Sequence, residues 1–359
     1  AQGEMWTSAV QSIVVTPLEV GVGKQYTTIQ SAIDAANVGD IINVYPGTYN
    51  EGNLSRDIYT GVAPGTASGL LVYKNGLTIQ GVDVSGNPIT NRTNVAATII
   101  ATQRDVSLGD TIITGDNVTL SGLRFQLASL PVGCNKNVFA TGENFTLKNS
   151  VIDNLVLGCS GLYLSDERGN HVNTFTVQDN QFLKGEITII NGVGLTGLAS
   201  TRNITGNLIQ DITDWGGVSL TGITGSSWTT RGIGAVTVSG NTFFNNAYQI
   251  IARGASYANP VGYWTGFLAN NTFDKAVLTK TPDNDARMNS YERLGWVNSL
   301  TDPLNNVYFR MIGTDIQESV TRATTGDTIN VAAGTYTEFG QIVINKNLSI
   351  VGADKATTI

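Results

Sequence analysis

Apolar residues change their spacing within one short stretch near the amino-terminal end, residues 26–51. Three of them recur at intervals of three or four residues, which predicts a short helix with one buried face. The next two alternate with polar residues, which predicts a strand, and a Gly-Asp pair between the two patterns predicts a turn. The helical positions are Ile29, Ile33 and Ala36, the turn is Gly39-Asp40, and the strand positions are Ile42 and Val44.

The same pattern returns near the carboxyl-terminal end, in residues 315–338. Adding 287 to each residue number carries the first copy onto the second, so that Ile29, for example, falls on Ile316. A strand-like Leu-x-Ile-x-Gly segment follows each copy, at 77–81 and at 348–352, with an offset of 271. The first copy therefore holds 16 extra residues, which we expect to form a surface loop within 52–75.

Between the two copies, six segments each combine an alternating apolar strand with a Gly or Asn corner. Their last apolar residues are Phe125, Ile152, Phe182, Ile209, Phe243 and Phe273. The intervals of 27, 30, 27, 34 and 30 residues are typical of the coils of a solenoid, whose neighbours must stack to bury their apolar faces. Five asparagines lie at or beside one corner, where we expect a hydrogen-bonded ladder: Asn149, Asn180, Asn207, Asn241 and Asn271.

The order of helix, GD-x-I-x-V, G-x-Y-x-E and L-x-I-x-G resembles the cap and first coil of right-handed parallel β-helix proteins of the pectin-lyase-like superfamily. That superfamily includes polysaccharide lyases, glycosidases, esterases, phage tailspikes and surface proteins, so the resemblance implies a fold without choosing an activity. Tandem caps resemble the arrangement in large bacterial surface proteins. The catalytic patterns of pectate lyases, polygalacturonases and pectin methylesterases do not occur in this sequence, so no catalytic residue is carried over.

We therefore predict an all-β protein: a right-handed, single-stranded parallel β-helix with a short amino-terminal capping helix and the start of a second module. Residues 1–23 form a leading and capping segment, 24–279 the β-helix, 280–306 a linker, and 307–359 the cap helix and first coil of the second module. We interpret the interrupted second copy as part of a longer tandem protein, or as a coil completed against another molecule.

Composition narrows the choice of partners and location. Charged residues make up 14% of the chain and glycine occurs 41 times, which favours strands joined by tight turns. The formal charge of −7 gives a nucleic-acid partner no support, and no apolar run is long enough to insert into a membrane. The chain begins Ala-Gln-Gly-Glu, as an exported protein does after removal of its signal peptide, which predicts an extracellular or cell-surface location.

Few residues suit a disulfide, a metal site or a catalytic base. Cys134 and Cys159 are 25 residues apart, close to one coil, which favours a disulfide between adjacent coils over two separate buried thiols. The segment 283–285 begins like a calcium loop, but Arg287 stands where the next ligand belongs, so we predict a polar turn with no metal and no cofactor, and calcium binding there is the alternative. His171 is the only histidine and lies in a polar loop, with no nucleophile marked beside it.

The two longest excursions between coils are rich in aromatic residues and arginine. Sugars stack on aromatic rings, and arginine suits acidic sugars, so these residues are candidates for a carbohydrate-binding groove. The alternative is that the rings pack their own loops against the solenoid. The candidates are Trp215, Trp228, Arg231, Tyr248, Arg253, Tyr257, Tyr263 and Trp264.

Two functions remain. The first is a non-enzymatic extracellular surface module, adhesive or filament-forming, that associates end to end with another copy of itself. The alternative is a carbohydrate-binding β-helix or a polysaccharide-acting enzyme, a lyase or a glycoside hydrolase, that uses the loop groove. Tandem caps and the missing catalytic patterns favour the first, and the aromatic excursions favour the second.

Overall fold

The computed structural model describes most of the solenoid and much of both caps. The described residues are 16–52, 54–55, 67–102, 110–127, 136–154, 159–165, 174–191, 202–212, 216–222, 236–246, 248–253, 270–273, 276–280, 307–313, 316–323, 325–326, 328–331 and 340–352.

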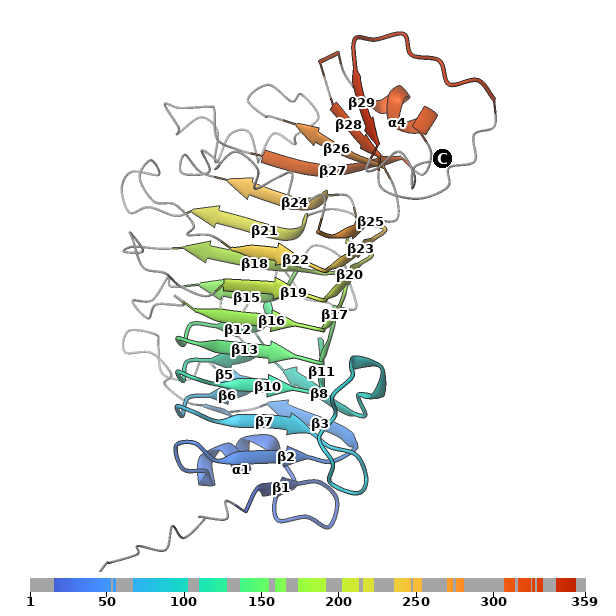
Figure 1. Cartoon of the computed structure of the whole chain (residues 1–359). Coiled ribbons are helices and arrows are strands. Elements are labelled where there is room, and N and C mark those ends of the chain that lie inside the picture. The colour runs from blue at the N-terminus through green and yellow to red at the C-terminus, as the bar shows by residue number, and fades with distance from the viewer. Residues whose placement is uncertain are drawn as a thin grey trace, which may run out of the picture.

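The chain forms a right-handed parallel β-helix, as predicted, in which each coil adds one strand to each of three parallel sheets (Figure 1). The first sheet contains β1 (Leu18–Val20), β2 (Ile41–Val44), β7 (Thr78–Gly81), β10 (Thr119–Ser121), β13 (Phe145–Lys148), β16 (Phe175–Gln178), β19 (Arg202–Thr205) and β22 (Thr237–Ser239). The second sheet contains β3 (Gly47–Gly52), β8 (Ala97–Thr102), β11 (Leu123–Leu127), β14 (Val151–Asp153), β17 (Gln181–Leu183), β20 (Leu208–Gln210), β23 (Thr242–Phe244) and β25 (Thr272–Phe273).

The third sheet continues from the solenoid into the second cap. Its parallel part contains β6 (Leu70–Val72), β9 (Thr111–Ile113), β12 (Lys136–Ala140), β15 (Cys159–Ser165), β18 (Gly185–Asn191), β21 (Gly216–Gly222) and β24 (Tyr248–Arg253). Two antiparallel strands follow, β27 (Val307–Gly313) and then β26 (Ala276–Lys280), and β26 pairs with β28 (Thr328–Val331), which pairs with β29 (Ser349–Gly352). A small antiparallel pair, β4 (Leu54–Ser55) and β5 (Ala67–Ser68), lies within the loop predicted at 52–75.

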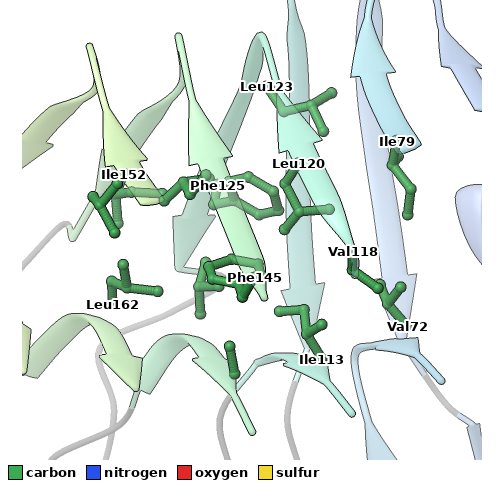
Figure 2. Close-up of a cluster of buried hydrophobic side chains, with 14 of the residues drawn as sticks. Val72, Ile79, Ile113, Val118, Leu120, Leu123, Phe125, Phe145, Ile152 and Leu162 are labelled. Carbon is green, nitrogen blue, oxygen red and sulfur yellow. The ribbon is translucent and has the colours of Figure 1, made fainter. Parts of the chain in front are cut away.

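The core consists of rows of apolar residues that stack from coil to coil. The six residues that mark the coils in the sequence occupy one continuous row of the second sheet, from Phe125 to Phe273. Phe145 stacks on Phe175 in the first sheet, and both are almost fully buried. Figure 2 shows Phe125, Phe145, Ile152 and Leu162 converging from different sheets on the same interior. The repeat spacing therefore reports the stacking that buries the core.

The asparagine ladder is present at the corner between the first and second sheets. Asn180, Asn207 and Asn241 are buried, and each donates from its side-chain nitrogen to the carbonyl of an apolar residue in the coil below. The side-chain oxygen of each accepts from the backbone amide below it, at 2.9–3.0 Å, and Asn271 continues the series. Ser150 rather than Asn149 meets the ladder in its coil.

Asn149 stands outside the ladder because its backbone has a left-handed φ of 52° at the corner itself. Asparagine is among the few residues other than glycine that adopt this conformation readily. Asn149 therefore forms the turn, and the next residue, Ser150, makes the contact with the ladder.

The first cap is formed by α1 (Ile29–Ala35), which covers the amino-terminal end of the core. Glu51 accepts hydrogen bonds from the backbone amides of Ile29 and Gln30, at 2.6 and 3.4 Å, and so satisfies two of the open donors of the helix. Burial raises the pKa of the Glu51 carboxyl, although the two amides lower it. A 3₁₀ turn at Arg92–Asn94 follows later, in the connection from β7 to β8.

The second cap repeats three elements of the first in the same order. The helix α4 (Ile316–Arg322) and the strand β28 lie 287 positions after α1 and β2, and β29 lies 271 positions after β7. A separate buried cluster holds this cap together: Val320, Ala323, Ile329 and Val331. No helix in the described part of the chain is long and apolar enough to cross a membrane.

Candidate functional site

One row of residues on the third sheet lies outside the main core. Side chains alternate between the two faces of a strand, and in β15 the residues Leu162 and Leu164 belong to the main core. Tyr163, between them, belongs to a separate cluster with Leu71, Ile112 and Phe139. These four residues are neighbours in register across β6, β9, β12 and β15, so the cluster follows the outer face of the third sheet.

Lys136 lies against the aromatic part of this row. Its Nζ is 4.9 Å from the centre of the Phe139 ring and 4.1 Å from that of Tyr163. The two rings meet edge to face, with centroids 5.5 Å apart and planes at 62°. Both distances suit an attraction between a cation and the negative face of a ring, which holds the lysine on the outer face of the sheet.

A carboxylate and two hydroxyls occupy the next strands. Ser160 is the register partner of Lys136, and Glu186 is the register partner of Ser160. One carboxylate oxygen, Glu186 Oε1, accepts from the Ser160 hydroxyl at 3.2 Å and from the Thr188 hydroxyl at 2.6 Å. Glu186 and Thr188 are only 9% and 6% exposed, so these contacts are held in a place that excludes most water.

We refer to Lys136, Phe139, Ser160, Tyr163, Glu186 and Thr188 as the wall cluster. It combines two aromatic rings, a cation, a carboxylate and two hydroxyls on three consecutive strands, β12, β15 and β18. Adjacent strands are about 4.8 Å apart, so the whole set spans about 10 Å along the solenoid. The two rings are only 1% and 8% exposed, so they anchor the cluster, and its half-buried members, Lys136 and Ser160, present a cation and a hydroxyl to solvent.

Asp110 lies beside the wall cluster, just before β9. Its backbone amide donates to the carbonyl of Lys136 at 2.9 Å, which places it on the neighbouring strand. The residue is 4% exposed, and burial raises the pKa of the Asp110 carboxyl to about 7. A carboxyl with this pKa exchanges its proton near neutral pH, unlike an ordinary aspartate.

Two of the carbohydrate candidates predicted from the sequence lie on the same sheet as the wall cluster. Tyr248 and Arg253 are the first and last residues of β24, which pairs with β21, the neighbour of β18. Their backbone positions are therefore two strands from Glu186. Six candidates lie outside the described residues: Trp215, Trp228, Arg231, Tyr257, Tyr263 and Trp264.

The predicted disulfide and the alternative of a calcium site at 283–285 stay predictions. Cys159 begins β15 and is the register partner of Gly185, whereas Cys134 lies outside the described residues. His171 and the segment 283–285 also lie outside them. Within the described ranges, no group of three or more His, Cys, Asp or Glu side chains is arranged to hold a metal ion.

None of the wall-cluster residues is among those predicted from the sequence. A signal does exist: Lys136, Ser160 and Glu186 are separated by 24 and 26 residues, close to one coil. Each lies just before the apolar part of its own strand. The residues that mark the coils in the sequence all lie on the second sheet. The spacing of the third-sheet residues is recognised only when the strands of that sheet are aligned with one another.

No protein-family model matches the chain, and a search of curated proteins finds no match. Solved structures do match. A pectin methylesterase from Aspergillus niger, in deglycosylated form, is 14% identical, with a TM-score of 0.34, over 68% of this chain and 87% of its own. Pectin methylesterase PemA from Erwinia chrysanthemi is 11% identical, with a TM-score of 0.35, over 66% and 82%. Pectate lyase Pel9A is 13% identical, with a TM-score of 0.27, over 65% and 77%.

Proposed function

We propose that this protein is an extracellular β-helix that binds polysaccharide on the outer face of its third sheet, at the wall cluster. The observation that carries the proposal is the juxtaposition of the Phe139 and Tyr163 rings with Lys136 and the Glu186 carboxylate. Sugar rings present apolar C–H faces and a rim of hydroxyls. The half-buried Lys136 ammonium and Ser160 hydroxyl exchange hydrogen bonds with that rim, while the buried Phe139 and Tyr163 rings hold the lysine in place.

The outer face of the third sheet suits a polymer better than a small molecule. Successive coils repeat at a constant spacing, so a linear glycan that lies across the strands meets a new strand about every 4.8 Å. The sequence candidates Tyr248 and Arg253 extend the same sheet beyond the wall cluster. A chain of several sugars would therefore bind more tightly than its monomer.

Turnover of the bound polysaccharide would need a proton acceptor or donor. Asp110 is the described carboxyl best suited to that role, because a general acid or base works best when its pKa lies near the working pH. Lyase or glycoside hydrolase activity is accordingly the extension of this proposal, to be measured with the same variants.

Binding to a panel of neutral and uronic-acid polysaccharides, measured by calorimetry, tests the proposal. We expect Tyr163→Ala and Glu186→Gln each to weaken binding about tenfold, or ~1.4 kcal/mol, and Arg253→Ala to weaken it less. Lys148→Met is the matched control, because Lys148 is exposed on the first sheet. If Tyr163→Ala and Glu186→Gln fold normally and bind as tightly as the unaltered protein, the wall cluster is not the site.

A second proposed role, as a structural module of a surface assembly, rests on the second cap. A β-helix cap closes one end of a solenoid, and this chain carries a second one whose last strand, β29, is exposed along its whole length. An exposed strand edge recruits further strands. Light scattering over a range of protein concentrations tests this role, which predicts association. A monomer at every concentration would rule it out.

A further inference from the structure

The connection from β7 to β8 is much longer than the equivalent connections in the following coils. It comprises residues 82–96, whereas β10 and β11 are joined by Gly122 alone, and β19 and β20 by Gly206 and Asn207. We refer to residues 82–96 as the strap. The strap leaves the solenoid at the corner between the first and second sheets, the corner that carries the asparagine ladder. Its contacts with Gly122 and Gly206 place it along that corner in later coils.

Hydrogen bonds within the strap give it a defined shape. The side chain and the backbone amide of Asn87 both donate to the Asp83 carboxylate, at 3.0 and 2.9 Å, and they hold the pKa of Asp83 below its ordinary value. The Ile89 amide donates to the Gly81 carbonyl at 2.9 Å, so the chain returns to the end of the strand that it has just left. The 3₁₀ turn Arg92–Asn94 follows. The strap is therefore an ordered segment that can carry a contact from one coil to another.

Ile89 fixes the strap to the next coil. It is buried, although most residues of the strap are exposed. Ile89 packs on the corner at Gly122, where the backbone has a left-handed φ of 65°. A Cβ added at Gly122 would lie 2.7 Å from the Cβ of Ile89, closer than two side chains can approach. Ile89 thus occupies the space that a side chain at this corner would need.

Arg92 connects the strap to a coil much farther along the solenoid. Its Nη1 donates to the Gly206 carbonyl at 3.1 Å, and its side chain is half-buried. In the first sheet, β10, β13 and β16 lie between β7, which the strap follows, and β19, which Gly206 follows (Figure 1). Four strand spacings separate β7 from β19, or about 19 Å. A charged donor makes this hydrogen bond stronger than one between neutral groups.

The coils that the strap spans are the coils that carry the wall cluster. In chain order, β10 to β18 form the three coils between the coil of β7 and the coil of β19, and they contain β12, β15 and β18. A solenoid coil normally contacts only its neighbours, as the asparagine ladder does here. An opening at one coil is then not felt several coils away. The Arg92 contact departs from that organisation.

We propose that the strap positions the wall cluster, because it ties the coil before the cluster to the coil after it and makes the three coils between them open as one unit. Arg92 is the positioning residue. A coil between the two ends cannot separate from its neighbours unless the Arg92 contact breaks or the strap moves with it. The role in ligand binding rests on the proposed function of the wall cluster, whereas the coupling of the coils does not.

Native-state hydrogen exchange of the full chain, read by mass spectrometry, tests the coupling. Arg92→Met removes the donor and keeps an apolar side chain. We expect exchange to become about threefold to tenfold faster in β12, β15 and β18, none of which Arg92 touches, as well as in the strap. Arg124→Met is the matched control, because Arg124 pairs with Asp153 at 2.8 Å between the neighbouring strands β11 and β14. The control should leave exchange in β18 and in the strap unchanged.

Coupling is reciprocal, so a change at the far end should loosen the strap. Gly206 has a φ of 67°, and a Cβ there would overlap the Asp179 carboxylate, so Gly206→Ala strains the corner that Arg92 contacts. We expect exchange in the turn Arg92–Asn94 to rise about as much as it does in Arg92→Met. Gly240→Ala is the matched control, since its φ is also 67° and it lies one coil beyond that corner. It should leave the turn unchanged.

Calorimetry with the same polysaccharide panel separates the strap from the binding site. We expect Arg92→Met to bind about threefold more weakly, because strands that open more often are less well organised for a ligand. Faster exchange without weaker binding would overturn the positioning role. If the unaltered protein binds nothing, the wall cluster fails as a site, and faster exchange in β18 would still support the coupling. If Arg92→Met speeds exchange only in the strap and beside Gly206, the contact is local and the coupling is overturned.

Discussion

The two caps have the same local structure and opposite surroundings. Ile42 and Ile329 are equivalent, and both are fully buried, yet Ile79 is buried while its equivalent Ile350 is 37% exposed. The helix and the strand next to it bury their residues within the cap itself. The following strand needs the next coil above it, and only the first cap has one in the described structure.

This difference shows where the stability of a solenoid resides. Each coil contributes its own folding free energy and an interface with each neighbour. The first cap belongs to a core that extends from Val20 to Phe243, whereas the second is held by a small cluster of its own. The caps therefore share a sequence pattern, and we expect them to differ in stability, which three sets of measurements can examine.

The largest effect should come from truncating the equivalent isoleucines. Ile42→Ala and Ile329→Ala each remove a fully buried side chain, at a cost of about 2–5 kcal/mol. We expect Ile42→Ala to lower the midpoint of the main unfolding transition in urea. Ile329→Ala should leave that midpoint unchanged and instead speed hydrogen exchange in α4 and β28.

The comparison between the caps fails if both variants lower the main transition equally, because the caps would then unfold as one cooperative unit. Val84→Ala serves as the control for both, since Val84 is 84% exposed and its truncation leaves no cavity.

A smaller effect should come from Lys74 and Lys346, each of which donates hydrogen bonds to carbonyls at the carboxyl-terminal end of its cap helix. Lys74→Met and Lys346→Met each leave carbonyls at a helix end without their charged donor, at a cost of about 1–2 kcal/mol. Because the contacts are equivalent, we expect the same loss of hydrogen-exchange protection in α1 as in α4. Lys148→Met controls for the loss of a positive charge. Unequal losses would mean that the lysine of one cap stabilises its helix less than the shared geometry indicates.

Much of this fold can be predicted from the sequence, because a solenoid repeats its signals. The row from Phe125 to Phe273 is visible as an interval of about one coil, and the offset of 287 locates α4 and β28 to the residue. The position of Gly76 is not visible in this way. Gly76 is the one residue that the first copy has in addition after its lysine. When the two copies are aligned by their strands, this extra residue is assigned to the loop before Lys74, and only the equivalent contacts of Lys74 and Lys346 show its true position.

The wall cluster is harder to predict for a physical reason. The core rows need apolar residues in every coil, but the outer face of the third sheet changes character along the solenoid, from Leu71 to Tyr163 to Thr188. Because the residue type in this row changes from coil to coil, the row produces no repeating pattern in the sequence. Glu186 in the sequence is one acidic residue before an apolar run, and its meaning comes from Ser160, one coil earlier.

The smallest effect concerns the carboxylate that closes the first cap helix. Burial raises the pKa of Glu51 above its ordinary value of 4.5, so the folded state holds this proton more tightly than the unfolded state does. Folding is therefore favoured below pH 4.5, and this contribution is lost as the pH rises through the folded-state pKa. Each tenfold difference in proton affinity between the two states is worth ~1.4 kcal/mol. Glu51→Gln cannot ionise and escapes that loss.

Urea unfolding at a series of pH values measures the contribution of Glu51 to the free energy of unfolding. The stability of Glu51→Gln relative to the unaltered protein should rise as the pH rises from 4.5, even though the variant makes weaker hydrogen bonds to the amides of Ile29 and Gln30. Asp40→Asn is the control, because it removes an acidic side chain from the turn that follows the same helix. A relative stability that falls with pH would mean that the helix amides outweigh burial. The first cap would then be stabilised by the ionised carboxylate itself.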